Sequence, residues 1–251
     1  MDPVDMSQAT YKIEVCFSPL SWPLFKTPGS LVVIADIFRA TTAMCAAFHN
    51  GVRAIIPVSE ISQSEAYKQQ GYIVAGERDG KKLDCADFGN SPFNFLDPAL
   101  RGKTIVMNTT NGTQAIRVAA GDDHEVVIGS FLNVSALSAY IMEQGRDVTV
   151  FCAGWKNRFS LEDGLFAGAL TEALLVGGGN RYLTRCDSAL ASTDLWLLAR
   201  GNPRQYIEKA AHRHRLRDMG LDDIIDFAMT PDLTSAIPVL RGMEIVNARQ
   251  I

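Results

Sequence analysis

The sequence predicts an α/β protein, a three-layer α/β/α sandwich with a mainly parallel sheet and a helical C-terminal part. Short apolar, β-branched runs alternate with helix-like segments from about residue 11 to residue 176, a pattern typical of strand–helix–strand units in a parallel sheet. From about residue 181 onward, helix-like segments follow one another. Right-handed crossovers are expected between the parallel strands.

The first part of the chain supplies four expected strands. Alternating apolar residues at 11–17 predict an edge strand, and the run LVVIA before Asp36 predicts a strand covered on both faces. Two further strands are expected at 54–58 and 72–75. An alanine-rich helix is expected near 40–49, and a helix with a polar face at 59–70.

The next part continues the alternation and then changes to helices. Strands are expected at 104–107, 125–128 and 147–151, followed by helices at 114–120, 134–144 and 161–176. Asn202-Pro203 predicts a helix start, and apolar pieces at 237–240 and 243–246 predict a closing hairpin. One domain over residues 1–251 is the simplest organisation, with GGGN at 177–180 as a candidate subdomain joint.

Composition and charge argue against several classes of protein. Twenty-four basic and 28 acidic residues give a net charge of −4, which disfavours a general nucleic-acid binder. The apolar runs are too short for a membrane helix, and the first five residues lack the features of a secretory signal. Five widely spaced cysteines without a CxxC pair predict free thiols and a cytoplasmic protein. A homodimer is compatible with these features.

Polar side chains lie at or just beyond the carboxyl ends of several predicted strands. In a parallel sheet these ends lie along one edge, where open α/β proteins bind ligands, so we expect the side chains to share one crevice. The residues concerned are Asp36, Glu77, Arg78, Asp79, Thr109, Thr110, Asn111, Ser130, Cys152 and Asp163.

The chemistry of these residues indicates phosphoryl transfer. Asp36, Glu77 and Asp163 are hard oxygen donors that suit Mg²⁺, whereas the isolated His49 and His124 do not form a zinc motif. Arg39, Thr41, Thr42 and the corner TTNGT suit an oxyanion, with Gly112 and Thr113 presenting backbone N–H groups at a helix start. Acids, a metal and an anion cradle are the parts that phosphoryl transfer uses.

Each of these residues also has an ordinary structural interpretation. Asp36 and residues 109–111 are good helix-capping and turn residues. Residues 77–79 can form ion pairs in a solvated turn, and acids at 162–163 favour the first turn of a helix. Capping by chance explains each residue better than it explains all of them together.

Two further patterns carry alternatives. Cys152 and Arg158 have the CxxxxxR spacing of a cysteine-dependent phosphatase loop, which makes Cys152 an alternative catalytic residue. Phe151 and Phe159 stand where a His and a Ser or Thr would support such a cysteine, so the metal-dependent scheme is favoured. The basic cluster at 212–217 is expected to be a solvated helix face, with a second anion contact as the alternative.

Six motifs occur in the order seen in one phosphatase family: DIFRATT, AGERDG, FGNSP, TTNGT, CAG and EDG. From about residue 12 to residue 240 the sequence resembles the 2-phosphosulfolactate phosphatases. The resemblance implies an α/β/α enzyme that uses Mg²⁺ to hydrolyse 2-phospho-3-sulfolactate to 3-sulfolactate and phosphate, a step toward coenzyme M. Asn90 and Ser91 of FGNSP join the candidate substrate-binding residues.

Two functions from different classes therefore compete. One is a metal-dependent phosphatase acting on a phosphorylated small hydroxy acid, and the other is a non-catalytic binder of anionic metabolites. Three carboxylates near an anion favour the enzyme, because a binder has no need of them. We predict Asp36, Glu77 and Asp163 as metal ligands and catalytic residues, and Arg39 and Arg78 as anion anchors. Hydrogen-bond donors to the substrate are expected from Thr41, Thr42, Ser91, Asn111 and Thr113.

Overall fold

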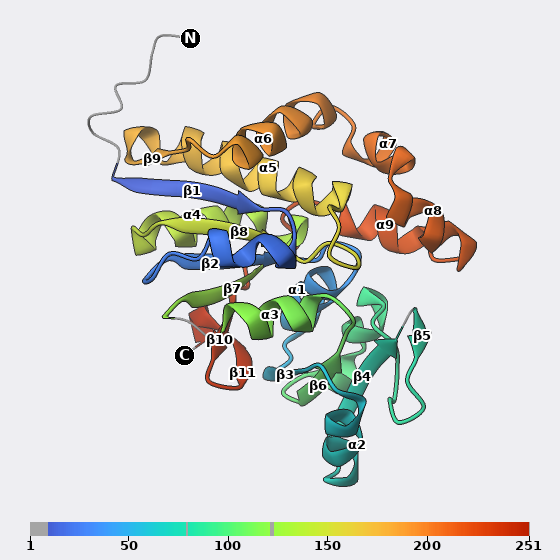
Figure 1. The fold of residues 1–251 in the computed structure, drawn as a ribbon. Coiled ribbons are helices and arrows are strands. Elements are labelled where there is room, and N and C mark those ends of the chain that lie inside the picture. Colours follow the sequence, from blue (N-terminus) through green and yellow to red (C-terminus); the bar gives the residue numbers. More distant parts are fainter. Residues whose placement is uncertain (1–9, 79, 121–122, 251) are drawn as a thin grey trace.

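The computed structural model describes residues 10–78, 80–120 and 123–250. In this part of the chain eleven strands form one sheet, mainly parallel, flanked by helices as expected for an α/β/α sandwich (Figure 1). The strands lie in the order β5 (Lys81–Lys82), β4 (Ile73–Arg78), β6 (Thr104–Asn108), β3 (Ala54–Val58), β11 (Glu244–Asn247), β10 (Pro238–Arg241), β7 (Glu125–Gly129), β2 (Leu31–Ala35), β8 (Val148–Cys152), β1 (Tyr11–Cys16) and β9 (Tyr182–Leu183).

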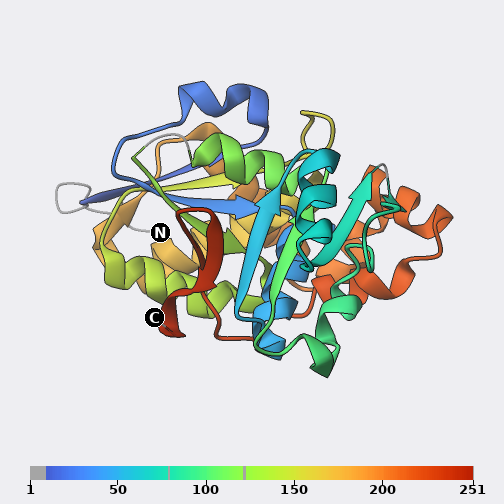
Figure 2. The ribbon, with the colours of Figure 1, turned by 90° about the horizontal axis from the view of Figure 1, so that it is seen from below.

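The C-terminal hairpin divides the sheet into two parallel groups. Strands β4, β6 and β3 pair in parallel, and so do β7, β2, β8, β1 and β9. Between them, β10 and β11 pair antiparallel with each other and with β7 and β3. In Figure 2, β3 runs steeply across the direction of β2. The single parallel edge assumed from the sequence is therefore wrong, because the hairpin interrupts it.

Nine helices are found in the described residues. They are α1 (Ala40–Asn50), α2 (Ile61–Gln69), α3 (Gly112–Ala119), α4 (Val134–Gln144), α5 (Leu161–Gly177), α6 (Asp187–Ala199), α7 (Pro203–Tyr206), α8 (Ala211–Asp218) and α9 (Asp222–Ala228). None of them is long and apolar enough to cross a membrane. Asn202 caps α7 by accepting a hydrogen bond from the Gln205 backbone, as its Asn-Pro sequence predicts.

Two large apolar clusters cover the faces of the sheet. On one face, strand residues such as Val33 and Val150 pack with α4, α5 and α6. On the other face, Ile34 and Phe151 pack with α1 and α3. Helix α1 is buried along its whole length except at His49, because it is covered on all sides by the rest of the fold. A third, smaller cluster lies under α2, at the opposite end of the molecule from α6 (Figure 1).

Most expected elements are confirmed, and two details differ. The expected edge strand at 11–17 is an inner strand, because β9 pairs along its free side. Strand β4 continues to Arg78, so Glu77 and Arg78 lie within it. The segment at 177–180 ends α5 and enters a short turn before β9. The five cysteines are free thiols, as expected. Asp79 and the first five residues, which entered the sequence analysis, lie outside the described residues.

Candidate active site

A polar pocket lies at the strand ends where side chains of the two strand groups meet. Residues after β2, on β4 and after β6 contribute to its wall, together with the loop after β8 and with α8. Its lining includes Asp36, Phe38, Arg39, Ala40, Glu77, Gly80, Asn90, Thr109, Thr110, Asn111, Trp155, His212, Arg215, Leu216 and Met219. Side chains from both strand groups thus come together, as expected, although the sheet is not continuously parallel.

Asp36 is the acid at the centre of this pocket. It is 7% exposed, and its Oδ1 accepts a weak hydrogen bond of 3.4 Å from the Ala40 backbone. Its other oxygen lies against the start of α3, since a Cβ built on Gly112 would be 2.9 Å from Asp36 Oδ2. Burial raises the pKa of Asp36 to about 6. Nearby Glu77 and Glu162 add to this effect, while the hydrogen bond from the Ala40 N–H lowers the pKa.

Glu77 faces Asp36 from the other strand group. Its Oε1 accepts hydrogen bonds from the backbone and hydroxyl of Thr110, at 3.3 and 3.1 Å, and its Oε2 accepts one of 2.6 Å from the Gly80 backbone. Arg39 Nη2 lies 3.9 Å from Glu77 Oε2, a long ion pair that leaves the guanidinium free to contact an anion. A carboxylate and a guanidinium therefore lie side by side in the pocket.

The loop after β6 and the FGNSP segment complete this wall. Asn90 donates a hydrogen bond of 2.8 Å to the Asn108 carbonyl, while its buried Oδ1 has no hydrogen-bond partner among the described residues. Asn111 is the N-cap residue of α3, so the positive end of that helix faces the pocket. Thr109 Oγ1 accepts a hydrogen bond from the Thr113 backbone and acts as a local cap.

Asp163 and Cys152 lie behind the pocket and do not line it. Asp163 is 2% exposed. Its Oδ1 accepts a 2.9 Å hydrogen bond from the Ile37 backbone and its Oδ2 a 3.0 Å bond from Gly154. The carboxylate thus joins the chain after β2 to the chain after β8. Burial raises the pKa of Asp163 well above its usual range, as do the neighbouring Glu162 and Asp36.

The geometry of Cys152 does not support the cysteine scheme. Its thiol is fully buried, and burial raises its pKa well above the usual value, with Asp163 adding to the effect. A nucleophilic cysteine needs the opposite shift, because the thiolate is the reactive form. Arg158 is exposed, in a turn whose backbone pairs with Trp155. The CxxxxxR spacing thus spans a buried strand end and an exposed turn.

Several predicted anion contacts lie outside the pocket. Arg78 points to the other side of β4 from Glu77, because successive side chains of a strand alternate. It donates hydrogen bonds to the Ser59 carbonyl and to Asn108 Oδ1. Thr41 Oγ1 accepts a hydrogen bond from the Asp36 backbone, and Thr42 Oγ1 donates one to the Ile37 carbonyl. Three more predicted contacts do not line the pocket. Ser91 is the N-cap residue of the turn at Pro92–Leu96, and Gly112 and Thr113 are buried at the start of α3.

Helix α8 brings two pocket residues, His212 and Arg215, from the basic cluster for which an anion contact was only the alternative expectation. His212 Nδ1 lies 2.7 Å from Glu162 Oε1, and Arg215 Nη2 lies 2.5 Å from His212 Nε2. The guanidinium of Arg215 also stacks on Trp155, 4.3 Å from the ring centroid. The expectation of a solvated face is wrong for His212, Arg213 and Arg215, which are buried or half-buried, and holds for His214 and Arg217.

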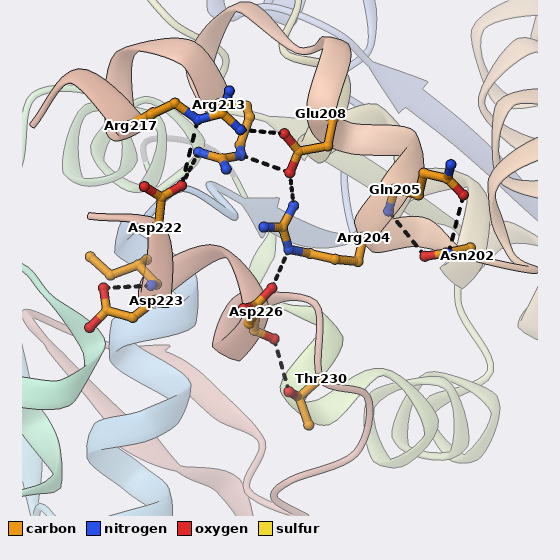
Figure 3. A network of polar contacts seen from close by, with 11 residues as sticks. Asn202, Arg204, Gln205, Glu208, Arg213, Arg217, Asp222, Asp223, Asp226 and Thr230 are labelled. Atoms are coloured by element: carbon orange, nitrogen blue, oxygen red, sulfur yellow. Dashed lines mark hydrogen bonds and ion pairs between the residues drawn. The ribbon is translucent and has the colours of Figure 1, made fainter. Parts of the chain in front are cut away.

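A network of ion pairs fixes α8 to its neighbours (Figure 3). Arg213, only 2% exposed, pairs with Glu208 at 3.1 Å and with Asp222 at 2.5 Å. Arg217 pairs with Glu208 at 2.6 Å, and Arg204 pairs with Glu208 and Asp226. Hydrogen bonds from Arg204 and Arg213 lower the pKa of Glu208 to about 2. These ion pairs therefore hold α8 against the short turn before it and against α9.

The acids of the pocket do not form a dense ligand cluster. Among the described residues, no group of three or more His, Cys, Asp or Glu side chains is arranged to hold a metal ion. Two carboxylates and an amide oxygen, from Asp36, Glu77 and Asn90, nevertheless line the same pocket. Hard oxygen donors in this small number, completed by water and substrate oxygens, are what Mg²⁺ commonly takes.

Comparison with known sequences identifies the family. A sequence model described as 2-phosphosulpholactate phosphatase matches residues 16–243. The chain belongs to the 2-phosphosulfolactate phosphatase family. It is 35% identical over 218 residues to a probable 2-phosphosulfolactate phosphatase of Caldanaerobacter subterraneus subsp. tengcongensis, covering 84% of this chain and 88% of the relative. Similar values are found for a protein of that name from Thermotoga petrophila, 35% identical over 83% of this chain and 88% of the relative.

A more distant relative in the family extends the match. The probable 2-phosphosulfolactate phosphatase of Clostridium acetobutylicum is 28% identical over 88% of this chain and 94% of its own length. The match to the family model covers the strand ends of both groups and also α8, because it runs from residue 16 to residue 243. Every residue described above as lining the pocket lies within the matched region. The resemblance inferred from the six motifs is thereby confirmed at the level of the family.

Proposed function

We propose that this protein hydrolyses 2-phospho-3-sulfolactate, or a closely related phosphorylated hydroxy acid, to the hydroxy acid and phosphate. The names of the relatives support the substrate. One structural observation carries the chemistry: Asp36, Glu77, Arg39 and the N-terminal end of α3 share one pocket. The product from the sulfonated substrate would be 3-sulfolactate, through which the reaction would contribute to coenzyme M synthesis.

The pocket residues divide the work of phosphoryl transfer between them. Such reactions depend on positioning and on stabilising negative charge, with little covalent work for the protein. Arg39 supplies a guanidinium that can bind phosphoryl oxygens in a bidentate manner, and the positive end of α3 adds its dipole. Asp36 lies next to both and is the residue on which the proposed chemistry centres.

Magnesium belongs to this proposal, with Asp36 and Glu77 as its ligands and the Asn90 amide oxygen beside them. The ion would polarise the phosphoryl oxygens and neutralise charge that develops on them. The orphaned, buried Oδ1 of Asn90 fits a cation, since a buried oxygen without a donor is costly. Asp163 is left out of this ligand set, because it does not line the pocket that Asp36, Glu77 and Asn90 share.

The test is a phosphate-release screen across phosphorylated C3 acids, with Mg²⁺ and after complete chelation by EDTA. We expect release from 2-phospho-3-sulfolactate, loss of activity on chelation and recovery when Mg²⁺ is restored. Absence of release from every acid, alongside measurable binding of these acids, would favour the non-catalytic binder. Activity that survives complete chelation would refute the role of magnesium and leave the phosphatase proposal standing.

A further inference from the structure

Arg215 is the second arginine of the pocket, and it comes from a helix instead of a strand end. Its guanidinium stacks on Trp155 and donates to His212 Nε2. Its Nε is buried and finds no acceptor among the residues that the structure describes. An arginine can only donate hydrogen bonds, and a buried donor without an acceptor is costly. Arg215 is thus a preorganised donor for an anion that enters the pocket.

A chain of hydrogen bonds holds Arg215 in this position. Because Arg215 donates to Nε2, that nitrogen must accept, and the proton of the neutral imidazole lies on Nδ1. Nδ1–H then donates to Glu162 Oε1 at 2.7 Å. Glu162 is 1% exposed and sits in the first turn of α5. The order Glu162–His212–Arg215 runs from the buried helix α5 to the pocket surface, so the guanidinium has a fixed direction.

The two arginines belong to different walls. Arg39 lies with Asp36 and Asn111 on the wall made by the residues after β2 and β6, where the proposed metal and phosphoryl group belong. Arg215 lies with Trp155, Leu216 and Met219 on the wall made by α8 and the loop after β8. Because both sets of residues line the same pocket, a small substrate with its phosphoryl group on the first wall can place another substituent on the second.

We propose that Arg215 binds an anionic group of the substrate other than the phosphoryl group, a sulfonate or a carboxylate, and that His212 and Glu162 are positioning residues for it. This inference rests on the proposed function. The planar fork of a guanidinium fits two oxygens of either group. Arg215 would therefore make the pocket selective for phosphate esters that carry a second negative charge.

The test compares four phosphate esters with the wild-type protein and Arg215→Met. The esters are 2-phospho-3-sulfolactate, 2-phospholactate without the sulfonate, 1-sulfopropan-2-yl phosphate without the carboxylate, and isopropyl phosphate without either. We expect removal of the contacted group to lower wild-type kcat/KM by about 10- to 100-fold, the range for a charge-assisted hydrogen bond. In Arg215→Met, removing that group from the substrate should lower kcat/KM little further. The loss that the substitution itself causes with the full substrate should appear mainly as a higher KM. The ester that shows this coupling identifies the group.

Equal losses on all four esters in Arg215→Met would overturn the proposal, because Arg215 would then act on the phosphoryl group or on the fold. Arg217→Met is the matched control, since Arg217 lies on the same helix and pairs with Glu208 outside the pocket. It should leave the ratios between esters unchanged. Glu162→Gln keeps an oxygen for the Nδ1–H and should preserve the ratios, whereas Glu162→Met should shift them toward those of Arg215→Met. Unchanged ratios in Glu162→Met would overturn the positioning role.

Calorimetric binding of 3-sulfolactate, lactate and propane sulfonate separates this inference from the phosphatase proposal. If no ester is hydrolysed but an anion binds and needs Arg215, the phosphatase proposal fails and the anion contact stands. If esters are hydrolysed and neither turnover ratios nor binding depend on Arg215, the anion contact fails alone. A protein that neither turns over the esters nor binds the acids overturns both.

Discussion

Replacement of Gly112 by alanine tests the close contact between α3 and Asp36. The new Cβ would lie 2.6 Å from Ala40 Cβ and 2.9 Å from Asp36 Oδ2. Carbon atoms pack best at about 3.5–4.0 Å, so α3 and the chain after β2 must separate by roughly 1 Å. Overpacking of this kind costs about 1–3 kcal/mol, offset by up to about 1 kcal/mol from the better helix propensity of alanine.

The net loss of stability is about 1–2 kcal/mol, which for a chain of this size lowers Tm by about 2–8 °C. The effect on catalysis should be larger, because a misplacement of about 1 Å at a reacting group can cost about 100-fold in rate. We therefore expect kcat to fall by about 10- to 100-fold in a protein that is still folded at assay temperature. Thermal unfolding followed by circular dichroism and phosphate-release kinetics measure the two effects.

Gly201→Ala is the control, since a Cβ at Gly201 meets nothing within 4 Å. It should leave both Tm and kcat close to the wild-type values. Should Gly112→Ala behave like this control, the contact between Gly112 and Asp36 does not constrain the pocket and our account of that wall is wrong. A large fall in Tm with unchanged kcat would separate packing from catalysis and remove Asp36 from the centre of the chemistry.

Three further predictions follow from the site. Asp36→Asn keeps the shape and removes the charge, so kcat should fall on the order of a thousandfold. The kcat of Cys152→Ser should stay within about tenfold of the wild-type value. The reverse order in steady-state assays would restore the cysteine scheme. Arg39→Lys loses the bidentate fork and should lower kcat/KM by about tenfold or more, and unchanged kinetics would place Arg39 outside the substrate site. Glu208, whose pKa falls from 4.5 to about 2 in the folded protein, stabilises the fold above pH 4.5 and loses this effect as the pH falls toward 2. Urea unfolding between pH 5 and 2.5 should therefore show a weaker pH dependence in Glu208→Gln, and identical slopes would contradict the network's role.

The local elements were predictable because their signals lie within a few residues of one another. The strand at 54–58 and the helix at 134–144 are found with the expected bounds, since each is a continuous apolar or periodic run. The two-residue strand β9 was missed because it is too short for any periodicity. Its pairing turns the expected edge strand into an inner one, and only the folded structure reveals this neighbour.

The site was predictable in part for the same reason. Asp36, Arg39, Glu77 and residues 109–111 line the pocket because strand ends gather polar side chains. Arg78 could have been separated from Glu77 by the alternation of side chains along a strand, had β4 been extended to include both. His212 and Arg215 could not be placed, because the contact of His212 with Glu162, which orients both, joins positions about fifty residues apart in sequence. Local pattern carries no information about such a contact.

The position of the C-terminal hairpin has a consequence for biosynthesis. Strands β10 and β11 fill the gap between β7 and β3, yet the ribosome makes residues 238–247 after every other strand. Until they emerge, β7 and β3 each keep an edge of unpaired backbone groups that can pair with another chain. The sheet that carries Asp36 and Glu77 therefore becomes continuous only when the hairpin inserts, and before that step a nascent chain is prone to aggregate at these open edges.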